Sequence, residues 1–329
     1  MNVVPGLRLR AFAGDADFPA MAQVANANFI ANGMQIVRTA DDLRAEYAGF
    51  KRCDPAHDVV LAEVHGELVG YARSMGWWTL EDGSLVQGHL GHVLPAWRRR
   101  GVGSALLRWL EARQREIATD YPGAPAYLHH AFVTEGEAVR AAFLVKQGYV
   151  AQRHFQEMRR ATLDDLPAFA LPEGFEVRPV QPEHLRAIFD AHMQALKGSW
   201  GVAPPRPGDF ENWCTLPSFQ PDLWQVAWHV ETGQVAGQVK PWIDARQNEA
   251  LGRRRGYTEF ISVGAPWRRR GIARALVVRA LRAQREAGMT ESELGVDSDS
   301  PYGASRVYEA CGFRVFKRNA VYRKPLARN

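Results

Sequence analysis

The chain has few cysteines and lacks a long apolar run. Its three cysteines, Cys53, Cys214 and Cys311, are odd in number and far apart in 329 residues, which argues against a disulfide framework or a cysteine-based metal site. No apolar run approaches the roughly 18 residues that cross a bilayer, and the first residues lack the cationic and apolar blocks of a secretion signal. We therefore expect a soluble, cytoplasmic protein that does not enter a membrane.

Histidine does not supply a metal site either. His89 and His92 lie three positions apart in a predicted strand, so their side chains point to opposite faces. The adjacent His129 and His130 also diverge. We expect no metal ion, because these spacings do not bring a ligand set together.

Lysine is scarce, and arginine carries most of the positive charge. Only six of the 41 basic residues are lysines, and the formal net charge is +5. Arginine suits phosphate and carboxylate groups, so the charge leaves a nucleic acid and a phosphorylated small molecule open as partners. Hydrophobic residues make up 46% and charged residues 23% of the chain, which excludes a disordered or fibrous protein.

The chain repeats itself. The segment WRRRGVG at 97–103 matches WRRRGIA at 267–273, and Gly148-Tyr149 matches Gly312-Phe313 at nearly the same offset. A steady offset over several landmarks indicates a duplicated domain rather than a short-period solenoid. The alternative is one larger domain in which a basic loop recurs by chance.

The length favours about two domains. We predict an N-terminal domain at 1–160 and a C-terminal domain at 175–329. The linker between them, 161–174, is rich in proline and alanine and has no hydrophobic periodicity.

Both halves show the same order of predicted elements. A short strand is followed by a helical region, a hairpin, a further strand, the arginine–glycine loop with an amphipathic helix, and then a strand, a helix and closing strands. Such a mixture predicts an α/β or α+β layer fold. The expected strands are 7–11, 59–64, 67–75, 85–93, 126–133 and 149–160, then 175–180, 224–230, 234–243, 257–263, 292–298 and 313–324. The expected helices outside the loop region are 15–30, 40–51 and 136–147, then 182–196 and 302–311.

The arginine–glycine loop is the strongest chemical signal in each half. Small residues at a strand-to-helix turn let the backbone approach a ligand, and the following helix N-terminus offers unpaired N–H groups. The flanking arginines add charge-assisted bonds to the same anion. The loop lacks the GxxxxGK[ST] pattern of a Walker loop and the third glycine of a dinucleotide fingerprint. It therefore predicts a phosphate cradle.

These loops resemble a known family motif. Residues 98–103 and 268–273 read Arg-x-x-Gly-x-Gly and Arg-x-x-Gly-x-Ala, similar to the acetyl-CoA motif of the GCN5-related N-acetyltransferases (GNAT). In the second half, Tyr308-Glu309 followed by Gly312-Phe313 resembles the family segment that ends in Leu-Tyr-Glu-x-x-Gly-Phe. The resemblance covers nearly the whole chain and extends to tandem members of the family. It implies two GNAT-like domains, each a mixed, mostly antiparallel sheet flanked by helices.

The resemblance implies that acetyl-CoA is a co-substrate, with its pyrophosphate held by the loop amides. Ser300 stands where family members commonly have an asparagine that bonds the pantetheine arm. The implied contacts in the second half are Ile261, Ser262, Val263, Arg268, Arg269, Arg270, Gly271, Ile272, Ala273, Arg274 and Ser300. Those in the first half are Arg98, Arg99, Arg100, Gly101, Val102 and Gly103.

The resemblance also implies an acid and a base. Tyr308 matches the tyrosine that protonates the departing CoA thiolate, and a phenol with a pKa near 10 keeps its proton at pH 7. Glu259 is the expected base. Period-2 alternation places it on one strand face with Tyr257, Ile261 and Val263. Tandem relatives carry the glutamate at the position of Tyr257, so the role is carried to the same face and not to the same position.

The first half lacks the acid. Leu144 holds the matching place, Gly136 stands in place of Ser300, and His89 in place of Glu259. We therefore expect a catalytically degenerate N-terminal domain and a C-terminal N-acetyltransferase, of the acyltransferase class, that acts on a primary amine of a small molecule.

Two other functions are considered. A nucleic-acid binder is disfavoured, because the arginine triplets sit at loop-to-helix junctions and no aromatic stacking motif accompanies them. A CoA-binding regulatory protein without turnover remains the alternative. The acceptor stays open among aminoglycosides, polyamines, protein N-termini, amino-sugar thiols and amino acids. In the family, the region that corresponds to 199–219 lies over the acceptor. We expect a monomer, because the two domains can pack as a pseudo-dimer.

Overall fold

The computed structural model describes residues 4–50, 52–300 and 302–327. The chain divides into two compact units. Unit 1 comprises residues 1–152 with 320–329, and unit 2 comprises residues 153–319. Each unit thus takes its closing strand from the other half of the chain. The division into domains at 1–160 and 175–329 stays a prediction.

Unit 1 is built on five strands in the order β1-β2-β3-β4-β5. All neighbours run antiparallel except β4 and β5, which are parallel. The strands are β1 (Leu7–Ala11), β2 (Val59–Val64), β3 (Glu67–Thr79), β4 (Leu85–Val93) and β5 (Tyr127–Thr134). The helices are α1 (Phe18–Ala31), α2 (Ala40–Ala48), α3 (Pro55–Asp58), α4 (Val102–Thr119) and α5 (Ala138–Lys146), with 3-10 turns at Asp15–Asp17 and Pro95–Trp97.

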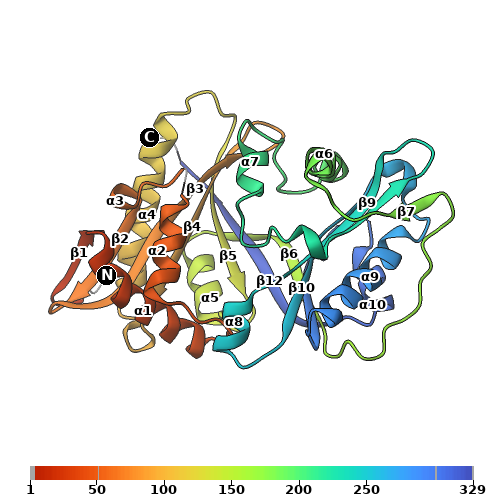
Figure 1. Cartoon of the computed structure of the whole chain (residues 1–329). Helices are drawn as coiled ribbons and strands as arrows, with labels where there is room; N and C mark the ends of the chain where they lie inside the picture. Colours follow the sequence, from red (N-terminus) through yellow and green to blue (C-terminus); the bar gives the residue numbers. More distant parts are fainter. Residues whose placement is uncertain (1–3, 51, 301, 328–329) are drawn as a thin grey trace. The chain divides into compact units, whose positions relative to one another are not determined.

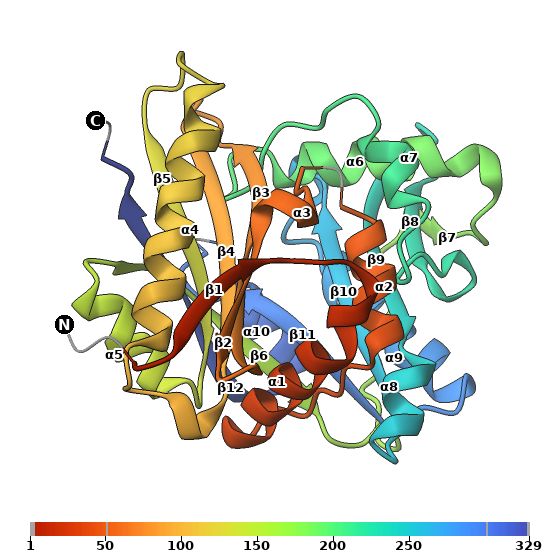
Figure 2. The same ribbon diagram turned by 90° about the vertical axis from the view of Figure 1, so that its left-hand side faces the viewer.

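Helices cover both faces of the sheet in unit 1. Along β2, Val59 and Leu61 pack with α1 and α2, whereas Val60 and Ala62 pack with α4, as the two-residue period of a strand requires. Figure 2 shows α4 running along the strands of this unit. A strand buried on both faces explains why β2 reads as a nearly continuous apolar run.

Unit 2 repeats this plan. Its strands follow the order β6-β11-β10-β9-β8-β7, with β10 and β11 parallel and the other neighbours antiparallel. The strands in this order are β6 (Val150–Arg160), β7 (Phe175–Val177), β8 (Gln225–His229), β9 (Val235–Ile243), β10 (Arg255–Val263) and β11 (Glu291–Asp297). The last strand, β12 (Arg314–Pro325), begins in unit 2 and belongs to unit 1 from residue 320 onward. The helices are α6 (Leu185–Leu196), α7 (Asp209–Trp213), α8 (Ala245–Ala250), α9 (Ile272–Glu286) and α10 (Ala304–Ala310), with 3-10 turns at Pro182–His184, Pro221–Leu223 and Ala265–Trp267.

Two cores lie on opposite faces of the unit 2 sheet. Helices α9 and α10 pack on the face that carries Val239, whereas α6 packs on the face that carries Val226 and Trp228. Figure 1 shows α6 on one side of β9 and β10, with α9 and α10 on the other. The strand carrying Glu259 is therefore enclosed between two helical layers.

The predicted fold class is confirmed, since each unit is a mixed, mostly antiparallel sheet flanked by helices. The expected strands 59–64 and 85–93 agree with β2 and β4 to the residue. The short helices α3, α7 and α8 were not anticipated.

The proline- and alanine-rich segment 161–174 packs against unit 2. Leu163 is buried, and Leu166, Phe169 and Leu171 pack against the core of α9. The amide of Leu163 donates to the carbonyl of Thr290 at 3.0 Å. This segment is therefore a strap fixed to unit 2.

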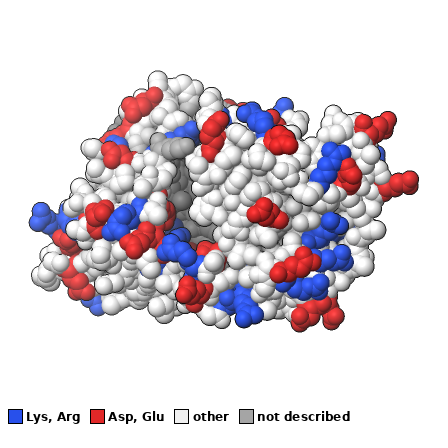
Figure 3. Space-filling model, viewed as in Figure 1, with Lys and Arg blue, Asp and Glu red and all other residues white. Residues whose placement is uncertain are grey.

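Three further observations concern possible partners. No helix within the described residues is long and apolar enough to cross a membrane. In the same residues, no three histidine, cysteine or acidic side chains form a group that could hold a metal ion. Basic and acidic side chains are interspersed on the face drawn in Figure 3.

Candidate functional site

A bulge in β10 shapes the candidate site. Glu259 pairs with Lys240 of β9, but the next pair is Ser262 with Gln238, so two residues of β10 face a single residue of β9. Phe260 lies in the bulge with φ of 51°, a left-handed conformation that a bulky residue rarely adopts. A bulge of this kind re-aims the side chains that follow it.

The bulge overturns the predicted alternation along this strand. Residues paired across an antiparallel ladder share a face, so Glu259 and Ser262 point to the same face as Lys240 and Gln238. Ile261 instead packs with the core of α9 on the opposite face. The grouping of Glu259 with Ile261 was therefore wrong, because the extra residue shifts the period of the strand.

Strands β10 and β11 separate at the site. Their parallel pairing runs only from Arg255 to Tyr257 on β10. Beyond it lies a cavity of about 230 Å³. The residues that line this cavity are Glu259, Phe260, Ile261, Gly295 and Tyr308. The structure thus brings the predicted base and the predicted acid to one cavity.

Glu259 is held in a largely apolar setting. Its Oε2 accepts a hydrogen bond from Nε1 of Trp242 at 3.0 Å. Burial raises the pKa of the Glu259 carboxyl; the Trp242 bond opposes this rise, and the charges of Glu293 and Glu157 add to it. A carboxylate whose pKa moves toward neutrality is suited to accept a proton at physiological pH.

Tyr308 projects from the short helix α10. It is only 6% exposed, and burial is the main reason that its pKa lies above the ordinary phenol value. Among the described residues its hydroxyl makes no hydrogen bond. The hydroxyl therefore keeps its proton near neutral pH and is free to donate it to a ligand.

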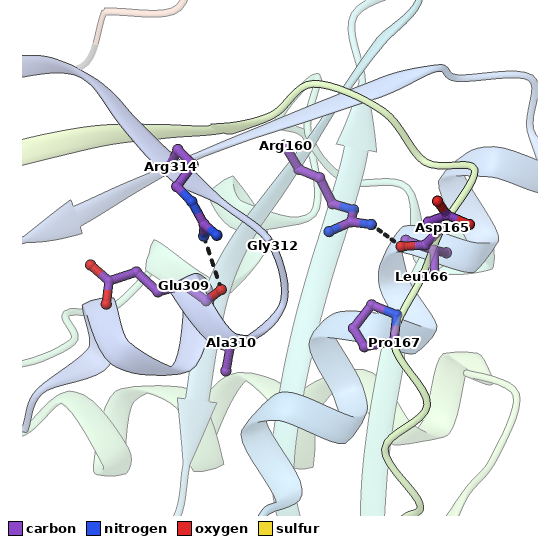
Figure 4. A pocket seen from close by; sticks show the side chains of 8 residues that line it. All are labelled: Arg160, Asp165, Leu166, Pro167, Glu309, Ala310, Gly312 and Arg314. Atoms are coloured by element: carbon purple, nitrogen blue, oxygen red, sulfur yellow. Dashed lines mark hydrogen bonds between the residues drawn. The ribbon is translucent and has the colours of Figure 1, made fainter.

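The end of α10 is anchored by a buried arginine. Nη1 of Arg160 donates to the carbonyl of Cys311 at 2.8 Å, and Nη2 donates to the carbonyl of Asp165. A Cβ at position 312 would clash with the Arg160 guanidinium, and Gly312 has φ of +87°, so only glycine suits this turn. Figure 4 shows Arg160, Asp165 and Gly312 among the residues that line a second cavity, of about 450 Å³. Neither predicted catalytic residue lines that cavity.

The arginine–glycine loops have the same backbone in both units. Gly271, at the N-cap of α9, has φ of 90°, and Gly101, at the N-cap of α4, has φ of 94°. Arg269 and Arg99 are also left-handed, at 62° and 60°. Neither N-cap supplies a side-chain bond, so the first amides of both helices remain available to an anion.

The first arginine of each loop binds protein carbonyls or amides. Arg268 donates from Nε to Val263 O at 3.1 Å and from Nη2 to Ala195 O at 2.9 Å. Arg98 donates to Oδ1 of Asn28 at 2.9 Å. These two side chains brace the loops, and the exposed side chains at 99, 100, 269 and 270 are the ones that can reach a ligand.

The other predicted contacts surround this loop. Ile261, Ser262 and Val263 end β10, and Ile272, Ala273 and Arg274 form the first turn of α9. The Ser262 hydroxyl lies 2.9 Å from Nδ1 of His192 in α6. Ser300, between β11 and α10, accepts a bond from the Tyr302 amide at 3.5 Å and is not among the residues that line the cavity of Glu259.

The corresponding region of unit 1 contains a set of hydrogen-bonded side chains. Nε2 of His89 lies 2.9 Å from the hydroxyl of Tyr149. This hydroxyl donates to Glu111 at 3.3 Å, and Lys324 pairs with Glu111 at 2.8 Å. Leu144 is buried. Burial keeps His89 neutral by holding its pKa well below the ordinary value.

Sequence reasoning missed three residues around Glu259. Trp242 binds its carboxylate, and Lys240 and His192 are buried on the same side of the sheet. The signal for Lys240 was present, because a lysine inside an apolar strand is rarely buried without a reason. Nothing local in the sequence pointed to Trp242 or His192.

Comparisons with known proteins agree with this architecture. The model of the Acetyltransferase (GNAT) family matches residues 185–313, and a GNAT domain model matches residues 55–151. A mycothiol acetyltransferase from Geodermatophilus obscurus is 30% identical over 318 residues, which cover 92% of this chain and 91% of that protein. The chain belongs to the GNAT family. Another mycothiol acetyltransferase, from Mycobacteroides abscessus, is 30% identical over 239 residues, covering 70% of this chain and 72% of that protein.

Solved GNAT structures share the fold over nearly the whole chain. A GCN5-related N-acetyltransferase from Sphaerobacter thermophilus has a TM-score of 0.77 at 27% identity and covers 99% of this chain and 98% of its own. A tandem GNAT protein from the clavulanic acid biosynthesis pathway has a TM-score of 0.67 at 17% identity, over 98% and 99% of the two chains. The protein is a tandem GNAT N-acetyltransferase, as its motifs predicted.

Proposed function

We propose that unit 2 transfers the acetyl group of acetyl-CoA to a primary amine of a small molecule, with Glu259 as base and Tyr308 as acid. The observation that carries this proposal is the shared cavity of the two side chains. It lies where β10 and β11 separate, on the strand that leads into the loop of Gly271.

The two groups suit direct transfer. Glu259 accepts the proton of the acceptor ammonium, and the free amine then attacks the thioester carbonyl carbon. The new C–N bond forms as the C–S bond breaks, and Tyr308 gives its hydroxyl proton to the departing thiolate. The acetylated nitrogen then loses its second proton, which restores the Tyr308 hydroxyl. Burial favours the reactive form of each group, since it makes the Glu259 carboxylate more basic and keeps Tyr308 protonated.

The loop at the start of α9 suits the pyrophosphate of CoA. Its first amides have no side-chain cap, and the left-handed Gly271 leaves the approach to them open. A Cβ there would lie 3.3 Å from Nε of Arg274 and would occupy this approach. Arg269 and Arg270 are exposed beside it and supply positive charge.

Unit 1 has the loop but not the reactive pair. We propose that it performs no turnover, because Leu144 cannot donate a proton and His89 is neutral and bonded to Tyr149. We also propose that the protein acts as a monomer and does not bind nucleic acid. In this proposal, only unit 2 carries out the reaction.

A screen of primary amines with free CoA release as the readout tests the proposal. We expect release with at least one acceptor, and a strong loss of rate in Glu259→Gln and Tyr308→Phe. Acetyl-CoA binding by calorimetry without CoA release from any amine would instead favour a regulatory protein. Wild-type rates in both variants would place the reaction elsewhere in the chain.

A further inference from the structure

Lys240 is a buried lysine next to the candidate base. It is 1% exposed and lies directly opposite Glu259 in the antiparallel pair of β9 and β10. Residues in such a pair point to the same face with Cβ atoms about 4.5–5.5 Å apart. The ammonium and the carboxylate therefore start from neighbouring positions on the face covered by α6.

Aromatic rings surround the Lys240 ammonium. Nζ lies 4.8 Å from the ring centre of Trp213, 5.7 Å from Trp224 and 5.4 Å from Phe260. Within the described residues, no carboxylate or other acceptor bonds to it. Cation–π contacts recover part of the lost hydration, but a buried amine without an anionic partner remains costly. Burial accordingly lowers the pKa of Lys240 to about 7.

Glu259 also forms no ion pair in the described parts of unit 2. Its recorded hydrogen bond comes from the neutral indole of Trp242. Two opposite charges thus occupy adjacent positions on one face, are both largely withdrawn from water, and do not pair with each other. Such an arrangement suits a ligand that carries a negative charge for Lys240 and a positive charge for Glu259.

Lys240 is the group on this face that can meet an anion. His192 lies close by, with its ring 6.2 Å from that of Phe260, but burial lowers its pKa to about 3 and keeps it neutral. Phe260 connects the two regions, because it lines the cavity of Glu259 and also contacts Nζ of Lys240. Lys240 itself does not line that cavity, so binding of a cavity ligand to Nζ requires the Phe260 ring to turn aside.

We propose that the acceptor carries a carboxylate close to its amine, and that Lys240 binds this carboxylate while Glu259 faces the amine. Amino acids and similar small zwitterions are the class that fits. Polyamines and aminoglycosides do not fit, because they would place a further cation against Lys240. This proposal rests on the proposed function of unit 2 and adds the acceptor class.

Matched acceptors test the carboxylate. Free amino acids and their methyl esters differ in this one charge, so their ratio of kcat/KM reports its binding. We expect the wild-type enzyme to prefer the free acids. Lys240→Met keeps the length of the side chain and removes its charge, so the ratio should fall about 10- to 100-fold, the value of a hydrogen bond to a charged group, mainly through KM. Lys197→Met, at an exposed lysine after α6, is the matched control.

An unchanged ratio in Lys240→Met, or a wild-type preference for esters, would overturn the carboxylate site. A thermal melt checks that the variant folds. If it does not fold, short carboxylic acids without an amine are tested on the wild-type enzyme. They should compete with the acceptor but not with acetyl-CoA, whereas their neutral amides should not compete; no competition would also overturn the site.

Different results would contradict the proposed acetyl transfer and the proposed carboxylate site. No CoA release with any amine would refute acetyl transfer itself. Equal release from acids and esters would leave acetyl transfer intact and refute the role of Lys240 alone.

Discussion

In each unit, the antiparallel strand pair before the arginine–glycine loop contains a bulge. In the pair β3–β4 of unit 1 the bulge lies on β3, whereas in the pair β9–β10 of unit 2 it lies on β10. Ser74 pairs with His89 and Trp77 with Gln87, so the extra residue belongs to β3 and leaves β4 regular. In unit 2 the extra residue is on the strand of Glu259 itself. The bulge therefore lies on opposite strands of the equivalent pairs β3–β4 and β9–β10. Only in unit 2 does it lie on the strand of the proposed base.

The two units also differ in what fills the space beside this strand. In unit 1, His89, Tyr149, Glu111 and Lys324 satisfy one another's hydrogen bonds. In unit 2, Tyr308 has a hydroxyl without a partner in the described residues, and a cavity lies next to it. A buried polar group left without a partner costs free energy, which is reasonable at a site where a ligand completes the bond.

The loops, by contrast, have hardly diverged. Their glycines and their left-handed arginines have nearly the same φ in both units. A phosphate cradle of this kind depends on backbone conformation, which one glycine fixes. The reactive pair depends on two side chains and a bulge, and is lost more easily after a duplication.

The largest expected effect comes from placing a side chain in one loop at a time. Gly271→Glu should abolish turnover, because the new side chain fills the approach to the α9 amides and its charge repels phosphate. Calorimetry with acetyl-CoA and the rate of CoA release measure the loss.

Gly101→Glu is the matched control. Its φ of 94° matches the 90° of Gly271, so both variants carry a similar backbone strain of about 1–3 kcal/mol. Turnover should persist in Gly101→Glu. Loss of turnover in this variant alone would reverse the assignment of the active unit.

Removal of the acid should have the next largest effect. Tyr308→Phe keeps the ring in place and removes the proton, so kcat should fall about 100- to 1,000-fold while the affinity for acetyl-CoA changes little. Stopped-flow or coupled detection of CoA release measures kcat.

The matched position in unit 1 is Leu144. Leu144→Ala should destabilise the protein by about 2–5 kcal/mol, as is usual for a buried leucine, without changing kcat per folded molecule. A Tyr308→Phe enzyme with wild-type kcat would contradict the role of this tyrosine as acid.

The sequence was sufficient to predict the helices and strands that have a regular hydrophobic periodicity. The hairpins and the helices after each loop follow from alternation, from turn residues and from four-residue spacing, and their predicted positions are confirmed within a few residues. The left-handed glycines could be predicted too, because the motif that contains them requires them.

The bulge at Phe260 could not be predicted in this way. A phenylalanine with φ of 51° carries no local signal, since its conformation is imposed by the pairing of β9 with β10. The exchange of closing strands was equally hidden, because 149–160 and 313–324 have similar patterns and only long-range pairing decides which unit each joins. Both features are tertiary, and both determine which residues meet at the site.

A smaller effect is expected at the base. Glu259→Gln keeps the shape and the bond from Trp242 but removes the basicity, so kcat should fall at least about tenfold. The rise of kcat with pH that belongs to the Glu259 carboxyl should disappear, and part of the rate should return at high pH, where free amine is abundant. A wild-type pH profile in the variant would exclude Glu259 as the base.

The same variant has a second readout. Burial raises the pKa of Glu259 in the folded state, so folding favours the protonated form and the ionised form costs stability. Above the folded pKa the wild-type protein bears this cost, and Glu259→Gln does not. The variant should therefore melt at a higher temperature at pH 8, and this advantage should vanish near pH 4. If the difference in melting temperature between the variant and the wild-type protein were the same at both pH values, the carboxylate would be well solvated.

The smallest expected effect on catalysis is at the polar core of unit 1. Tyr149→Phe removes the hydroxyl that bonds His89 at 2.9 Å and Glu111 at 3.3 Å and leaves their buried atoms with fewer partners. The free energy of unfolding should fall by about 1–3 kcal/mol, measured by urea denaturation, while kcat and the KM for the acceptor stay the same. This loss of stability would shrink at mildly acidic pH only if His89 became charged there. Because burial holds the pKa of His89 well below its ordinary value, we expect the loss to stay the same at mildly acidic pH. A fall in kcat at unchanged stability would instead show that the side chains filling unit 1 contribute to the reaction, and the two units would then differ less in function than in structure.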